Sequence, residues 1–251
     1  MINKVKILNS KVNIISLQKT LNVIDKWITV QDIKKYICLF NVHMCMEAYD
    51  SNDFHNVVDS ADLVLADGFP IYFGQKLMGY SDAEHIRGVD LTVQLSNFSQ
   101  KKNIPIGFLG GRKNTLTNMC DIFKRKYNVD TINYSYSPPF GQWTDEEKKN
   151  MINDINKSEI KILFVGLGCP KQEYWMYNNK DKLNCIMIGV GAAFDFIAGN
   201  KKSAPLWIQK IGFEWLFRFI SEPKRLWQRY LKHNPRFLYY FMLQYFSSKR
   251  R

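Results

Sequence analysis

The sequence has few of the residues that form metal or disulfide sites. Its five cysteines contain no CxxC pair, and its four histidines, His43, His55, His85 and His233, are widely separated and form no HExxH motif. An odd number of scattered cysteines predicts reduced thiols in the cytoplasm. Because there is also no DxD pair, the sequence predicts that no metal takes part in catalysis.

Long apolar segments and several familiar motifs are also missing. No stretch approaches the roughly 20 apolar residues that a membrane-spanning helix needs, and residues 1–16 lack the apolar segment of a signal peptide. There is no GxxxxGK[ST], no complete GxGxxG and no GxSxG. These absences weigh against a P-loop protein, a dinucleotide-dependent dehydrogenase and a serine hydrolase.

Short apolar runs dominate the first two hundred of the 251 residues, and 46% of the chain is hydrophobic. Nearly continuous runs of this kind are typical of buried parallel strands, and helix-length segments separate them. The pattern predicts a Rossmann-like, doubly wound α/β fold with a mainly parallel sheet. The predicted strands lie at 36–41, 62–67, 105–110, 131–136, 160–168 and 185–191.

The amino-acid composition of the chain changes near residue 200, where aromatic residues begin to alternate with Lys and Arg. Residues 199–251 contain six Lys, six Arg and two Glu, and so carry ten of the twelve net positive charges. We therefore expect a catalytic α/β domain over 1–199 and a basic helical appendage over 200–251. Proline positions predict helices near 205–221 and 223–233 and a third from about 235.

Five basic residues of the appendage have helical spacing. Arg218, Arg225, Arg229, Lys232 and Arg236 are separated by seven, four, three and four positions, so they could share one helix face. On composition alone, a basic and aromatic segment fits either a nucleic acid or an anionic membrane surface.

Three predicted strands end in glycine and lead into a helix, at 108–115, 165–173 and 189–195. Glycine lets the backbone approach a ligand closely, and the helix that follows offers free N–H groups to an anion. A nucleotide diphosphate fits such loops, although glycine also serves tight turns without any ligand. The candidate binding residues are Gly110, Gly111, Gly166, Gly168, Gly191 and Asp195.

Several segments in order along the chain together resemble the WecG/TagA/CpsF glycosyltransferases. They are ADGFPIYFGQKLMGY (66–80), RGVDL (87–91), FLGG (108–111), SPPF (137–140), GLGCPKQEYW (166–175), GVGAAFDFIAG (189–199), AP (204–205) and GFEWLFRFISEPKRLWQRY (212–230). Random α/β sequences would not supply both PKQExW and EWLxRxxxEPxRLW at these separations.

The resemblance implies an inverting, metal-independent enzyme without a cofactor. Its donor would be a UDP-sugar carrying N-acetylmannosamine, its uronic acid or a hexose, and its acceptor an undecaprenyl-diphosphate-linked saccharide. Such an enzyme serves surface polysaccharide or teichoic acid synthesis and docks peripherally on the cytoplasmic face of the membrane. The resemblance makes nucleic acid an unfavoured partner, and it does not decide whether the protein forms homo-oligomers. A non-catalytic nucleotide-sugar-binding or membrane scaffold is the alternative.

The resemblance also implies roles for individual residues. Asp67 would be the general base that deprotonates the acceptor hydroxyl, although a carboxylate there could also cap the helix that follows. Gln172 would contact the donor. Asn41 would line the pocket, or simply be a turn residue. Arg218, Arg225 and Arg229 would bind anionic lipid and diphosphate.

The chain departs from the family pattern at Leu39 and His85, and also at Ser203 and Gln228, where arginine is common. Leu39 stands where a threonine is common, so the role of that threonine cannot be transferred to this chain. His85 stands where an arginine is usual, and Arg87 lies two positions further on. Either residue could serve the anionic donor, and Arg87 has the advantage of a permanent charge.

Overall fold

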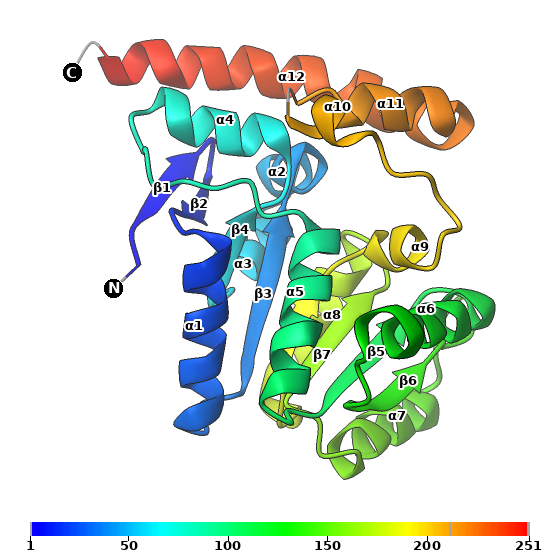
Figure 1. Ribbon diagram of the computed structural model, residues 1–251. Coiled ribbons are helices and arrows are strands. Elements are labelled where there is room, and N and C mark those ends of the chain that lie inside the picture. The colour runs from blue at the N-terminus through cyan, green and yellow to red at the C-terminus, as the bar shows by residue number, and fades with distance from the viewer. Residues whose placement is uncertain (1, 211, 250–251) are drawn as a thin grey trace.

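The computed structural model describes residues 2–210 and 212–249, apart from the side chains of Leu206, Lys210 and Arg225. A six-stranded sheet with helices on both faces forms the body of the molecule, and the C-terminal helices lie across one end of it (Figure 1). The predicted α/β fold is therefore confirmed.

All six strands of the main sheet are parallel, in the order β4-β3-β8-β7-β5-β6. Each of the six predicted apolar runs overlaps one of them, and five contain their strand completely. The strands are β3 (Lys35–Phe40), β4 (Leu63–Ala66), β5 (Ile106–Gly110), β6 (Ile132–Tyr136), β7 (Ile162–Gly166) and β8 (Ile186–Gly189). The strands other than the edge strand β6 are almost wholly buried, which explains why their sequences are apolar without alternation.

Helices cover both faces of the sheet, and each face has its own apolar core. Successive residues of a strand point to opposite faces, so Phe40 belongs to one core and Leu39 to the other. The helices of the body are α1 (Leu17–Thr29), α2 (Val42–Asp50), α3 (Asn52–Asp59), α4 (Phe69–Leu77), α5 (Gly88–Lys101), α6 (Lys113–Tyr127), α7 (Asp145–Lys157), α8 (Lys171–Asn179) and α9 (Ala193–Ile197), with a short turn η1 (Lys180–Lys182).

An N-terminal hairpin, which the sequence patterns did not reveal, lies beside the main sheet. It consists of β1 (Lys4–Ile7) and β2 (Ser10–Asn13), paired antiparallel. The buried side chain of Asn13 accepts a hydrogen bond of 2.8 Å from the backbone N–H of Val64 in β4. This bond satisfies a buried backbone donor at the edge of the sheet.

The helices of the appendage differ from those expected. The first predicted helix is divided into α10 (Leu206–Lys210) and α11 (Glu214–Ser221), with Gly212 between them at φ +82°. A Cβ at Gly212 would lie 2.4 Å from the ring of Phe69, so glycine at this turn permits both the backbone conformation and the close approach.

Pro235 does not break the last helix, contrary to the prediction. Helix α12 runs without interruption from Pro223 to Lys249. Proline removes one backbone hydrogen bond, but the turns beyond it bury Phe237 and Phe241 in the core and pair Arg236 with Asp50 at 2.6 and 2.9 Å. Tertiary contacts thus outweigh the local penalty.

Helix α12 is attached to the body along much of its length. It packs against α2, and Phe241 lies so close to Gly74 of α4 that a Cβ there would be 2.9 Å from its ring. Farther along, Gln244 bonds the backbone of the hairpin at Lys6 and Leu8, at 2.7 and 2.8 Å. The appendage and one face of the α/β body therefore share a core. The domain boundary at residue 199 stays a prediction from the amino-acid composition.

None of the helices within 2–210 and 212–249 is both long and apolar enough to cross a bilayer.

Candidate active site

The predicted site residues of the body follow the strands at one edge of the sheet. Asp67 comes after β4, Asn41 after β3, Gly191 after β8, Gly168 after β7 and Gly111 after β5. Because parallel strands end at the same edge, residues far apart in sequence form one row in the strand order of the sheet.

The Asp67 carboxylate does not cap the helix that directly follows it. The N-cap of α4 is Gly68, and no side chain caps that helix. Instead, Asp67 Oδ1 accepts a hydrogen bond of 2.8 Å from the N–H of Gly88, the first residue of α5. Its Oδ2 lies 3.5 Å from Asn41 Nδ2, and the residue is partly exposed. One carboxylate oxygen is therefore fixed, and the other is held only by a long contact.

Asn41 connects the body to the appendage. It is the N-cap of α2, and its Oδ1 accepts from the N–H of Met44 at 3.2 Å. The same oxygen lies 3.4 Å from a guanidinium nitrogen of Arg229 in α12. The residue therefore does more than form a turn, because its amide lies between Asp67 and an arginine of the appendage.

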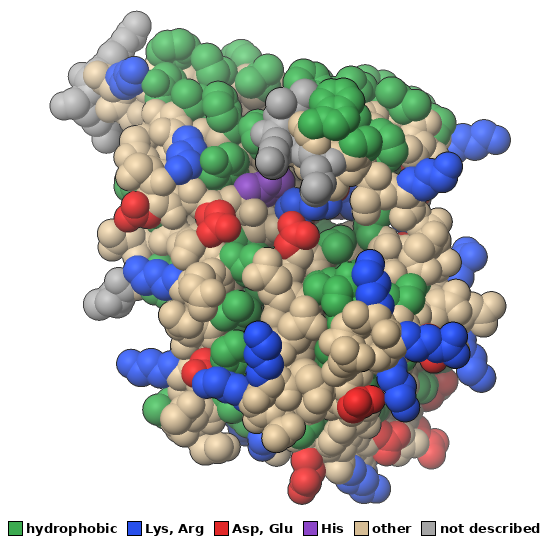
Figure 2. Space-filling model, viewed as in Figure 1, with side chains coloured by type: hydrophobic (Ala, Val, Ile, Leu, Met, Phe, Trp, Pro, Cys, Tyr) green, Lys and Arg blue, Asp and Glu red, His purple; other side chains and the backbone are tan. Residues whose placement is uncertain are grey.

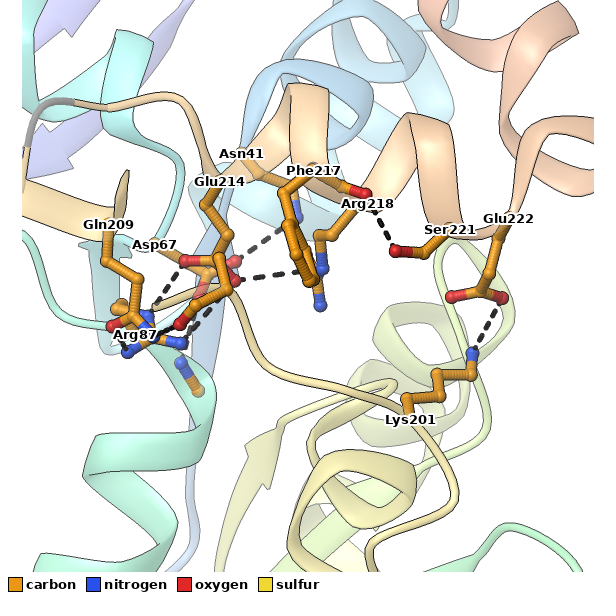
Figure 3. Close-up of polar contacts among 12 residues, drawn as sticks. Asn41, Asp67, Arg87, Lys201, Gln209, Glu214, Phe217, Arg218, Ser221 and Glu222 are labelled. Atoms are coloured by element: carbon orange, nitrogen blue, oxygen red, sulfur yellow. Dashed lines mark hydrogen bonds and ion pairs between the residues drawn. The ribbon is translucent and has the colours of Figure 1, made fainter. Parts of the chain in front are cut away.

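His85 and Arg87 point in different directions from one short loop. His85 Nε2 donates to the backbone carbonyl of Asp67 at 2.5 Å. The Arg87 side chain instead contacts the appendage: its Nε lies 3.1 Å from Glu214 Oε2 and its NH1 donates to Gln209 (Figure 3). Sequence reasoning missed both partners of Arg87, and no spacing in the sequence indicates them.

The glycine loops after β5 and β7 are in direct contact. Gly110 has φ +110°, and a Cβ there would lie 2.6 Å from the backbone carbonyl of Gly166. The next residue, Gly111, donates its N–H to Gly166 O at 3.2 Å. Glycine at 110 is therefore required by both conformation and space.

Gln172 joins the other pair of loops. Its side chain is buried, and its Oε1 accepts from the N–H groups of Gly168 and Gly191 at 3.2 and 3.1 Å. Its Nε2 donates to Glu173 at 2.6 Å. Glu173 is fully buried, and burial raises its pKa to about 7.

Asp195 and Arg218 contribute to a second junction with the appendage. Asp195 accepts from Thr115 at 3.5 Å and pairs at 3.3 Å with Lys201, which also pairs at 3.2 Å with Glu222 (Figure 3). The guanidinium of Arg218 lies 4.4 Å from the centre of the Phe196 ring, close enough for a cation–π contact.

The five basic residues of the appendage do not form one exposed face. Arg218 is on α11, separate from the others, and Arg229 and Arg236 contact Asn41 and Asp50 of the body. Lys232 is exposed, and the side chain of Arg225 lies outside the described residues. Arg218 does not share a face with the other four residues, because α11 ends at Ser221 and a separate helix, α12, begins at Pro223.

The outer face of the appendage is largely apolar. Figure 2 shows hydrophobic side chains gathered on the side of the molecule formed by α10, α11 and α12. The exposed residues of this apolar face are Trp207, Phe213, Trp215, Leu216, Ile220, Trp227, Leu231, Leu238, Tyr239, Met242, Leu243 and Phe246. Contiguous apolar surfaces of this kind mark contact with a membrane or another protein.

The fold and the residues at the carboxyl edge of the sheet together define a class of protein. It is a Rossmann-like α/β protein with glycine loops and a carboxylate at the carboxyl edge of a parallel sheet, the place where such folds bind nucleotides. The model of the "Glycosyl transferase WecG/TagA/CpsF family" matches residues 5–251, so the chain belongs to this family and is a glycosyltransferase.

Two curated relatives share the printed name N-acetylglucosaminyldiphosphoundecaprenol N-acetyl-beta-D-mannosaminyltransferase. The protein from Bacillus spizizenii is 27% identical over 198 residues, which cover 78% of this chain and 74% of the relative. The protein from Bacillus subtilis is 26% identical over 218 residues, which cover 86% and 82% of the two chains. The family resemblance seen in the sequence is therefore confirmed.

Proposed function

We propose that this enzyme transfers a sugar from a UDP-sugar to an undecaprenyl-diphosphate-linked saccharide, with inversion at the anomeric carbon. The names of both Bacillus relatives support an N-acetylmannosaminyl donor and a lipid-diphosphate acceptor. At 26 and 27% identity, the uronic acid and hexose donors stay as alternatives. The product would enter a surface polysaccharide or a teichoic acid.

The single observation that carries the proposal is the geometry of Asp67. The Gly88 N–H holds one carboxylate oxygen at 2.8 Å, and the other lies on the side of Asn41 and the appendage. A sugar hydroxyl is a weak nucleophile, and a positioned carboxylate can accept its proton in the transition state. The hydroxyl oxygen then bonds the anomeric carbon as the bond to UDP breaks, and UDP leaves with the electron pair.

The donor would bind along the glycine loops of the same edge. The loop at Gly110 and Gly111 lies against that at Gly166, and Gln172 ties Gly168 to Gly191, so the shape of these loops is fixed without a ligand. The N–H groups of Gly111, Gly168 and Gly191 already donate within the protein, so a diphosphate would have to use other donors nearby or displace these bonds. Gln172 is buried beneath two loops, so it would act on the donor mainly by fixing their shape. A role for Asp195 beside the donor stays a prediction.

The basic residues near Asp67 and the glycine loops would balance the charge of the two diphosphates. Arg229 lies beside Asn41 and Arg218 lies over Phe196, both on the appendage side. We assign a role beside the donor to His85, which contacts Asp67 directly. Arg87 would serve the donor only after its pairing with Glu214 has opened.

The acceptor is anchored in lipid, which fits the apolar face of α10, α11 and α12. An amphipathic surface with Trp and Phe and nearby arginines suits the interface of an anionic bilayer. The enzyme would then work peripherally on the cytoplasmic face of the membrane, with Asp67 toward the lipid-linked saccharide.

The test is transfer from a panel of radiolabelled UDP-sugars to a lipid-diphosphate-linked acceptor, with chelator present. Asp67→Asn should lower the transfer rate by about 100- to 10,000-fold, the usual contribution of a general base, and should leave donor binding nearly intact. Asp53→Asn, in the first turn of α3, is the matched control and should behave as wild type.

Near-normal turnover in Asp67→Asn would refute the base assignment. Absence of transfer with every donor and several acceptors would instead favour a scaffold that binds nucleotide sugars without turning them over. That alternative is motivated by Leu39, a buried residue where the family commonly has threonine.

A further inference from the structure

Two of the four histidines, far apart in the sequence, meet where α12 packs on α2. His43 and Glu47 occupy positions i and i+4 of α2, and His233 lies on α12. Their rings and carboxylate converge: the centres of the two imidazoles are 5.0 Å apart. Among the described parts of the chain, these three residues form a group whose ligand atoms all lie within 4.8 Å of one another.

The spacing of the three ligand atoms is close to that of a tetrahedral metal site. Glu47 Oε1 lies 3.4 Å from His233 Nε2 and 3.8 Å from His43 Nδ1. Ligands about 2.0–2.1 Å from a zinc ion in tetrahedral directions are separated by roughly 3.3–3.4 Å. The two distances to the carboxylate are therefore near this value, and the two histidine nitrogens lie within 4.8 Å of each other.

The imidazole of His43 is in the form that binds a metal. Its ring is hydrogen-bonded to the backbone of Cys169, while Nδ1 is buried without a hydrogen-bond partner. We take the Cys169 bond to use the other nitrogen, which leaves an Nδ1 lone pair facing the Glu47 carboxylate. A ring N–H that donates to a backbone carbonyl is the usual support of a metal-bound histidine.

The charges around the cluster have both signs. Glu47 supplies a negative ligand, and the buried Glu173 lies beyond Cys169. Arg229 and Lys232 oppose a cation, while the charge of Arg236 is neutralised by Asp50 at 2.6 Å. The net charge around the cluster therefore attracts a cation only weakly, and the ion would be held mainly by bonds to two imidazoles and one carboxylate. Such ligands favour zinc over calcium or magnesium, which prefer oxygen ligands.

We propose that His43, Glu47 and His233 bind one Zn²⁺ ion that fastens α12 to α2. Two histidines and one glutamate would leave the fourth coordination position to water, so the site is more open than a zinc site with four protein ligands. Its effect would be to hold two helices together: the ion would fix the first turn of α2, whose N-cap is Asn41, and the turn of α12 that follows Arg229. The proposal does not depend on the sugar transferred or on Asp67 as the base.

The test is metal titration of the full-length, untagged protein, with Zn²⁺ followed by calorimetry and Co²⁺ followed by its visible absorption. We expect one equivalent of each metal, the intense absorption of a tetrahedral cobalt site, and a higher melting temperature that chelator reverses. His43→Gln and His233→Gln should each weaken binding by more than about tenfold, because even an outer-shell partner contributes that much.

His55→Gln is the matched control, since His55 is also a partly buried helical histidine but lies outside the cluster. It should bind both metals as wild type does. The proposal is overturned if wild type shows no saturable binding, or if both His variants bind as tightly as wild type, which would indicate adventitious binding at the cysteines. Transfer activity that survives chelation agrees with a structural ion.

Discussion

The two sides of the candidate site are held together by different interactions. On the sheet side, buried backbone and amide groups fix the loops, as in the two bonds that Gln172 accepts from Gly168 and Gly191. On the appendage side, ion pairs such as Arg87 with Glu214 close the contact, and the outer face is apolar. The sheet side is fixed by buried hydrogen bonds. On the appendage side, α12 packs on the core of the body, whereas α10 and α11 meet Arg87 through polar contacts that a charged ligand could replace.

The most severe change on the sheet side is Gly110→Ala. The added Cβ would lie 2.6 Å from the Gly166 backbone at a φ of +110°, so strain and overpacking together should lower the free energy of unfolding by about 3 kcal/mol or more. Gly141→Ala is the control: its φ is +106° and it has open space around the Cβ, so it should cost only about 1–2 kcal/mol.

Urea denaturation of the two glycine variants measures the difference. Equal losses of stability would mean that the loops at Gly110 and Gly166 do not approach each other as closely as described. The sheet side of the site would then not be preformed by packing.

On the appendage side, the largest effect should follow from removing exposed leucines. Leu231, Leu238 and Leu243 are 65, 61 and 51% exposed, so replacing all three by serine should leave the stability of the fold nearly unchanged. If each contributes about 1 kcal/mol in a bilayer, partitioning to anionic vesicles should fall by roughly 100-fold.

Vesicle sedimentation tests the leucine variant, with Gln228→Ser on the same helix as control. Unchanged partitioning would show that the apolar face does not meet lipid, and would favour a protein partner for it.

Gln172→Ala should have a smaller effect, confined to the sheet side. Two backbone N–H groups lose their acceptor, which should lower the free energy of unfolding by about 1–3 kcal/mol and weaken donor binding without changing vesicle binding. Denaturation and donor titration are the measurements, with the exposed Gln18→Ala as control. If vesicle binding fell together with donor binding, the two sides would not be independent.

The smallest expected effect is that of the ion pair between Asp50 and Arg236. Both side chains are about one third exposed, so a double-mutant cycle should give a coupling of only about 0.5–1 kcal/mol. The hydrogen bond and charge of Arg236 hold the pKa of Asp50 below its usual value. The coupling should therefore be complete above the unfolded pKa, near 3.9, and be lost as the pH falls through the lower folded value.

Unfolding measurements near pH 7 and near pH 3 would reveal this loss. A coupling that persists unchanged at the lower pH would show that the contact is packing and not charge.

Local patterns were enough to predict the sheet and the row of site residues along its edge. Buried parallel strands are continuous apolar runs, so the segments around Phe40 and Val165 can be recognised as strands from the sequence alone. Glycines after such runs, and Asp67 after another, then fall on the same edge in any parallel arrangement. The motifs then indicated the glycosyltransferase family of the chain, and the match of the family model confirms that family.

Other features could not be read from local patterns. Pro235 should break a helix by its own chemistry, but packing of Phe237 and Phe241 keeps that helix whole. A helical projection allowed the five basic residues to share one face, but Arg218 lies on α11 and the others lie on the separate helix α12, where Arg229 and Arg236 contact the body.

The sequence by itself determined which segments become strands, where the backbone must be glycine, and to which family the chain belongs. Those properties depend on periodicity and on steric limits over a few residues. Only the tertiary structure decided that Arg87 pairs with Glu214 and that His233 meets His43 and Glu47. Such pairs lie more than a hundred residues apart, and their contact is set by how helices pack on a shared core, which no short-range pattern encodes.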